Sequence, residues 1–240
     1  MSKSIKAAAL CLALLSCFTV LFPCTVRAAT CTDHTFIENT VIPATADNDG
    51  SVEYICTVCG ATKIDVIPKI ASVTLRTSTA PYRGKAQMPE AIVKDSTGAL
   101  ISRDNYTLSL ATASGASVPW AKRIGEYTVT VTFQGRYAGT DTKVFKIVPV
   151  KVENLDVESY GAKSVTISFD PVEGAKGYQI YYSKNKKGPW KRLATISGTS
   201  YTYNKFSSGV TYYFKVRAYK KVSTGNIHGI FSNVKSVKVN

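Results

Sequence analysis

Apolar and polar positions alternate through the C-terminal two-thirds of the chain. Within residues 127–133, four apolar side chains alternate with three threonines, which places the apolar groups on one face of a strand. Shorter alternations at 73–75 and 106–110 predict further strands, and residues 70–148 carry no apolar stripe at helical spacing. This segment is therefore predicted to form a β-sandwich.

The clearest alternation lies in residues 149–240. Three runs, at 165–169, 178–182 and 212–218, place apolar side chains at every second position. Turn segments rich in glycine separate these runs, as expected for short antiparallel strands. The chain is predicted to be all-β, with two tandem β-sandwiches joined by short, stiff spacers that contain proline.

The first 28 residues have a different pattern, typical of a secretory signal peptide. Lys3 and Lys6 precede an apolar run at 7–22, and small residues favour cleavage after Ala28. This run is shorter than the ~20 residues of a spanning helix, so we expect its removal and no membrane span afterwards. A lipobox-like sequence ending in Cys17 leaves lipidation as an alternative. The sequence predicts an extracellular protein, either secreted or non-covalently associated with the cell wall.

Residues 29–69 contain few apolar side chains, and segments of roughly 40 residues usually need a metal or disulfides to fold. This segment contains Cys31-x-x-His34 and Cys56-x-x-Cys59. Three thiolates and one imidazole complete the tetrahedral shell of a structural zinc ion. We therefore predict a small Cys3His zinc module, whose closed shell would leave no water for catalysis.

Two alternatives to the zinc site remain open from the sequence. A disulfide or redox pair between Cys56 and Cys59 would leave Cys31 unpaired and would give His34 no role. The βαβ pattern of a thioredoxin-like protein is missing around the pair. Free thiols are the second alternative.

Charge is distributed unevenly along the chain. The whole sequence has a formal net charge of +14. Residues 29–69 carry a net charge of −4, whereas residues 149–240 carry +10. A basic exported protein meets anionic wall polymers and acidic glycans, and its export argues against nucleic acid as a partner.

Candidate catalytic groups are sparse. His228 is interpreted as an exposed loop histidine, and the carboxylates Glu153, Asp156 and Glu158 as solvated neighbours. Phosphate-binding, dinucleotide-binding and helical metalloprotease motifs are missing from the sequence. The chain is therefore predicted not to be an enzyme.

Residues 150–240 resemble a fibronectin type III domain of the kind common in exported proteins of Gram-positive bacteria. The resemblance depends on segments 164–169, 172–178 and 208–219. It implies that Tyr212 occupies the tyrosine-corner position, where its hydroxyl bonds to nearby backbone.

Two weaker resemblances cover the rest. Residues 70–148 are similar to bacterial immunoglobulin-like repeats at 82–86, 93–98 and 125–132. Residues 29–69 resemble the small Cys/His segments interspersed in such surface proteins.

A candidate ligand face lies in the last module. The fibronectin arrangement implies that the strands at 178–182 and 212–218 pair in one sheet. Tyrosines interleaved with cations can stack on sugar rings and bind acidic groups, although a simply solvated strand face is the alternative. The face comprises Tyr181, Tyr213, Lys215, Arg217 and Tyr219. A basic segment at 184–192 around Trp190 lies beside it in the sequence.

Together these features predict a non-enzymatic, monomeric surface or secreted protein of a Gram-positive bacterium. Its predicted role is structural or adhesive, with anionic wall polymer, acidic glycan or other surface proteins as partners. The alternative is a set of accessory modules that present substrate within an extracellular glycan-degrading system.

Overall fold

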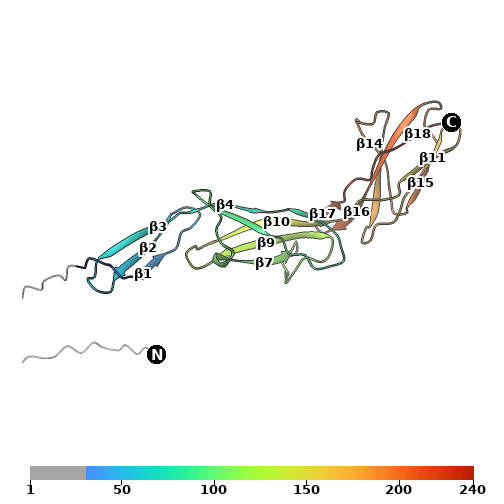
Figure 1. The fold of residues 1–240 in the computed structure, drawn as a ribbon. Helices are drawn as coiled ribbons and strands as arrows, with labels where there is room; N and C mark the ends of the chain where they lie inside the picture. The colour runs from blue at the N-terminus through green and yellow to red at the C-terminus, as the bar shows by residue number, and fades with distance from the viewer. Residues whose placement is uncertain (1–30) are drawn as a thin grey trace, which may run out of the picture.

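The computed structural model describes residues 31–240, so the predicted signal peptide and the lipidation alternative at Cys17 lie outside the described residues. The described chain is built almost entirely from β-strands, which confirms the predicted all-β class. The strands form three groups that lie end to end (Figure 1). Within residues 31–240, no helix has the length and apolar character to cross a membrane.

The first group is a single antiparallel sheet. Its strands are β1 (Phe36–Ile42), β2 (Gly50–Cys56) and β3 (Thr62–Ile67), in the order β1-β2-β3. Its small core contains Ala44, Val52 and Ile67, and Tyr137 from the second group packs against it. The sheet therefore has no second layer of its own and shares its core with its neighbour.

Backbone hydrogen bonds join the first group to the second. The Ala44 N–H donates to the Arg136 carbonyl at 2.9 Å, and the Ala138 N–H donates to the Ala44 carbonyl at 2.9 Å. The Ile70 N–H donates to the Thr45 carbonyl at 2.8 Å. These bonds connect Ala44 and Thr45, which precede Pro68, with residues that follow it. They therefore hold the first and second groups rigidly together.

The second group has two layers around a shared core. One layer pairs β4 (Ile70–Leu75) with β6 (Ala91–Asp95). The other has the order β5-β10-β9-β7-β8, formed by Thr79–Pro81, Thr140–Val148, Gly125–Phe133, Tyr106–Thr112 and Ser117–Val118. A 3-10 turn, η1 (Arg103–Asn105), precedes β7. Strands therefore occur at all three alternating runs predicted in this segment.

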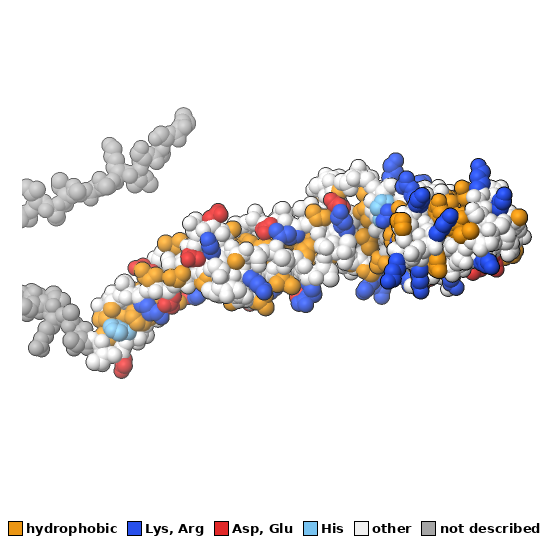
Figure 2. Space-filling view, turned by 90° about the horizontal axis from the view of Figure 1, so that it is seen from above, with side chains coloured by type: hydrophobic (Ala, Val, Ile, Leu, Met, Phe, Trp, Pro, Cys, Tyr) orange, Lys and Arg blue, Asp and Glu red, His pale blue; other side chains and the backbone are white. Residues whose placement is uncertain are grey.

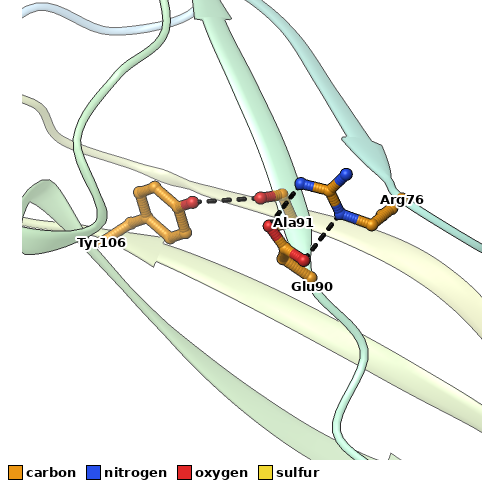
Figure 3. Close-up of polar contacts among 4 residues, drawn as sticks. All are labelled: Arg76, Glu90, Ala91 and Tyr106. Carbon is orange, nitrogen blue, oxygen red and sulfur yellow. Dashed lines mark hydrogen bonds and ion pairs between the residues drawn. The ribbon is translucent and has the colours of Figure 1, made fainter.

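Polar contacts connect neighbouring segments of this second group (Figure 3). The buried Tyr106 hydroxyl donates to the Ala91 carbonyl at 3.2 Å and so links the two layers. Arg76 donates to both carboxylate oxygens of Glu90, at 2.7 and 2.8 Å. Because these last two side chains are more than half exposed, their ion pair adds little to stability.

The third group is a two-layer β-sandwich. One sheet has the order β11-β12-β15, formed by Asp156–Gly161, Ser164–Ser168 and Ser200–Tyr203. The other has the order β14-β13-β16-β17, with β18 also paired to β16, formed by Lys191–Ile196, Gly177–Ser183, Thr211–Val222, Gly225–His228 and Lys235–Lys238. Phe214 and Ile180 are fully buried between the sheets.

Tyr212 behaves as the resemblance implies, because its hydroxyl accepts a bond from the Ser207 N–H at 3.3 Å. Phe169 fills the core next to Tyr178, with ring centroids 4.8 Å apart.

The second and third groups also interlock. Ile227 from β17 is buried in the core of the second group. The Tyr82 hydroxyl donates to a carboxylate oxygen of Glu173 at 3.4 Å. A side chain at Gly229 would place its Cβ 2.6 Å from the Pro149 carbonyl oxygen, so this close approach requires glycine. The described chain is therefore a stiff rod.

Candidate functional site

Four predicted metal ligands meet at the far end of the first sheet. One ligand atom from each of Cys31, His34, Cys56 and Cys59 lies within 4.8 Å of all the others. The Cys31 and Cys56 sulfurs are 3.9 Å apart, and the Cys59 sulfur is 3.3 Å from the His34 Nδ1. Tetrahedral zinc with bonds of about 2.3 Å to sulfur would separate two sulfurs by about 3.8 Å. The donor set and its spacing therefore fit one zinc ion.

The backbone around Cys56 is arranged for a metal-binding turn. Cys56 ends β2, and its carbonyl accepts the Gly60 N–H at 3.0 Å. Gly60 has φ of +74°, a conformation that glycine adopts without strain, as its place after the second ligand pair suggests. In the described residues the three cysteines are free, so none of them is joined in a disulfide.

The thiols of the cluster differ in acidity. Backbone N–H groups of Cys59 and Val58 lower the pKa of Cys56 to about 6. Burial, together with hydrogen bonds to the Cys56 and Cys59 side chains, raises the pKa of Cys31 to about 11. Amides directed at a sulfur favour its thiolate form, which is the form that binds metal.

Three of the five residues predicted for the ligand face, Tyr181, Lys215 and Arg217, lie in a cluster of rings and cations in the third group. Strands β13 and β16 are paired as expected, with Tyr181 opposite Lys215 and Gln179 opposite Arg217. The Lys215 Nζ lies 4.3 Å from the Trp190 ring centroid and 4.2 Å from that of Phe231. We call the surface formed by Tyr181, Trp190, Lys215, Arg217 and Phe231 the aromatic face.

The cations of the aromatic face already have partners within the chain. Arg217 donates to Gln179 at 3.0 Å and to the Tyr181 hydroxyl at 3.2 Å, and its guanidinium lies 4.9 Å from the Phe231 ring centroid. Burial and the charge of Arg217 lower the pKa of Lys215. These contacts hold the rings and cations in one arrangement.

Two tyrosines predicted for this face lie further along β16 in either direction. Tyr213 is opposite Ser183, and Tyr219 is opposite Gly177 and His228. Phe231, which the sequence reasoning missed, lies between both cations instead. Its position after β17 has no alternating pattern that would have indicated its neighbours.

A basic hairpin connects β13 to β14. It carries no acidic residue, and all its cations are exposed: Lys184, Lys186, Lys187, Lys191 and Arg192. Lys184 and Lys191 line a hollow together with Tyr182 and Pro189. In the space-filling view, lysine and arginine gather over the third group far more densely than over the first (Figure 2).

His228 lies in a strand, so its interpretation as an exposed loop residue was wrong. It ends β17, is half-buried, and its Nδ1 is buried without a hydrogen-bond partner. The loop prediction failed because segment 225–228 has no period-two apolar pattern and is held in place by pairing with β16. The ring faces Tyr219 and lines a hollow with the ion pair of Glu126 and Lys146.

This environment predicts a pH dependence. Burial, then the charges of Arg217 and Arg192, lower the pKa of His228 below its usual 6.5. Below that pH the unfolded chain binds a proton at His228 that the folded chain does not bind. The free energy of unfolding therefore decreases as the pH decreases. Between about pH 7.5 and about pH 5.5, the Tm should therefore fall further for the parent chain than for His228→Gln. Parallel Tm curves for the two proteins would contradict this assignment.

Comparison with known proteins identifies the third group. The family model "Fibronectin type III domain" matches residues 150–230, so the chain contains a fibronectin type III domain, as its resemblance implied. Such domains are typically non-enzymatic modules with structural or adhesive roles, and they are often extracellular.

Several individual proteins are similar to parts of the chain. A Kelch domain-containing protein of Saccharolobus solfataricus is 36% identical over 78 residues, which cover 32% of this chain and only 10% of that relative. A Fn3-like protein from Clostridium thermocellum is 24% identical, covers 38% of this chain and 91% of its own, and has a TM-score of 0.32. The FN1-FN3 domains of chicken CNTN1 are 15% identical over 80% of this chain and 77% of theirs, with a TM-score of 0.35.

Proposed function

We propose that this chain is a rigid, non-catalytic surface or secreted protein that attaches to anionic wall polymer or acidic glycan through its third module. Its three modules would span residues 29–69, 70–148 and 149–240, with the middle one of the bacterial immunoglobulin-like type. The observation that carries the proposal is the basic hairpin of the fibronectin domain, because five exposed cations there face solvent with no acid between them.

The hairpin suits a polymer more than a small ligand. Its cations lie along a projecting loop, and the hollow beside Lys184 and Lys191 is lined in part by the ring of Tyr182. A polyanion can contact several of these charges at once, which multiplies weak contacts. Tyr213, opposite the strand end at Ser183, would supply a ring beside the hairpin for a sugar.

The first module would bind a zinc ion that has a structural role and not a catalytic one. Cys31, His34, Cys56 and Cys59 would supply all four ligands, and the bound ion would stabilise the end of a sheet that has only a small core. A closed protein shell leaves no open position for substrate.

Retention on purified anionic wall polymer tests the proposal. Lys186→Gln with Lys187→Gln should lower retention several-fold at moderate salt, because two contacting charges are lost. Lys235→Gln with Lys238→Gln on β18 is the matched control, since it removes the same charge from exposed positions elsewhere in the module. Equal loss in both variants would indicate a nonspecific effect of net charge, and unchanged retention in both would refute the hairpin as the site.

A further inference from the structure

One face of the first sheet is apolar, and no layer formed by residues 31–240 covers it. The pairing places alternate residues of β2, namely Ser51, Glu53 and Ile55, on one face with their neighbours from β1 and β3. Four aliphatic side chains on this face are more than half exposed: Ile37 at 52%, Ile42 at 58%, Ile64 at 65% and Val66 at 67%. With Ile55 and Glu53, these residues define the aliphatic face.

A single carboxylate lies within this face. Glu53 is opposite Ile64 on β3 and opposite Thr40 on β1, and it accepts a hydrogen bond from the Asn39 side chain at 2.8 Å. An exposed aliphatic patch on a small module indicates a partner surface. The central anion indicates that this partner presents a cation surrounded by apolar groups.

The aromatic face of the fibronectin domain has the inverse pattern. There Lys215 and Arg217 lie against half-buried rings, and Ile230, which precedes Phe231 in the chain, is 55% exposed. The module charges are also complementary, at −4 for residues 29–69 and +10 for residues 149–240. Both faces belong to β-sheets, and two sheets can pack face to face.

We propose that the aliphatic face of one copy docks on the aromatic face of a second copy. The two faces lie at opposite ends of a stiff rod, so they cannot meet within one chain (Figure 1). A contact between different surfaces of identical chains can repeat from copy to copy, into an open string or a closed ring. This departs from the monomer that the sequence predicts.

A symmetric pairing of two aliphatic faces is the weaker arrangement. It would place two Glu53 carboxylates near each other in an apolar interface and would bring two modules of −4 together. The head-to-tail contact instead pairs Glu53 with cations. Because each face is small, the association should be reversible, stronger at higher protein concentration and weaker in salt.

Sedimentation velocity of the purified chain lacking only residues 1–28 tests the proposal. The average mass of the parent protein should at least double as its concentration rises at low salt. Ile64→Lys blocks the aliphatic face and Ile230→Asp blocks the aromatic face, both at exposed positions where folding should be unaffected. Each variant alone should remain monomeric.

Mixing the two variants gives the decisive result. Each retains the face that the other lacks, so the mixture should form a 1:1 pair and nothing larger. A parent protein that remains monomeric at every concentration would overturn the proposal. So would unchanged association of Ile230→Asp, because that result would indicate symmetric contact between aliphatic faces.

Discussion

Cys59→Ser is expected to abolish stoichiometric zinc binding and to unfold strands β1–β3 while the two larger units stay folded. Zinc binding in small Cys/His modules contributes on the order of 10 kcal/mol, far more than the core of Ala44, Val52 and Ile67 can supply. Metal content after anaerobic purification and hydrogen exchange across residues 36–67 would measure both effects. A strong chelator should reproduce them in the parent protein.

Val58→Ser is the matched control for this experiment. Val58 lies in the same turn between Cys56 and Cys59, but its side chain is 64% exposed and offers no ligand atom. This variant should retain one zinc ion per chain and full protection of β1–β3. If the parent protein itself holds less than about half an equivalent of zinc, the metal assignment is wrong.

Phe214→Ala is expected to destabilise the fibronectin domain by about 3–5 kcal/mol. The Phe214 side chain is fully buried between the two sheets, and its ring meets Phe206 edge-on at 5.6 Å. Removing it leaves a cavity that rigid strands on both sides cannot close. For a domain of this size, the Tm of the third module should fall by at least about 12 °C in calorimetry.

Tyr160→Ala provides the comparison at the surface. Tyr160 is 75% exposed, so its loss removes an aromatic ring without opening a cavity. Its Tm should remain within a few degrees of the parent value. A similar loss of stability in both variants would contradict the assignment of Phe214 to the centre of the core.

Alternation in the sequence was sufficient to predict the sandwich core. In β16, Tyr212, Phe214 and Val216 point inward because side chains alternate strictly across an unbroken strand. The meeting of the four Cys and His side chains was also predictable, since each pair is local in the sequence and only the approach of the two pairs depends on the fold. The geometry of a regular strand or of a short ligand motif is determined by residues only a few positions apart.

The aliphatic face could not be read in the same way. Ile37 and Ile42 are five positions apart in the chain, so an unbroken strand would place them on opposite faces. A bulge between Glu38 and Thr40 shifts the register and brings both to the same face. The sequence does not predict this bulge. It consists of one extra residue, Asn39, in an otherwise ordinary strand, and no residue type nearby distinguishes it.

Part of the aromatic face lay beyond sequence reasoning for a different reason. Trp190, Lys215 and Phe231 come from three separate segments: the residue before β14, β16, and the segment after β17. Their contacts depend on the folded sheet. The fibronectin resemblance correctly implied the pairing of β13 with β16, but nothing in the sequence placed Phe231. Contacts of this kind arise from sheet packing and are not encoded by spacing.

The shared core at Ala44 has a consequence for dissecting the molecule. Ala44 has no exposed surface, and Tyr137 covers it from the neighbouring unit. An excised peptide ending at Pro68 would lose that cover and the bonds from Arg136 and Ala138, whereas the remainder would expose Tyr137. The N-terminal sheet should therefore be produced together with the unit that follows it. A metal affinity measured on the isolated sheet would be lower than the affinity of the same cluster in the intact rod.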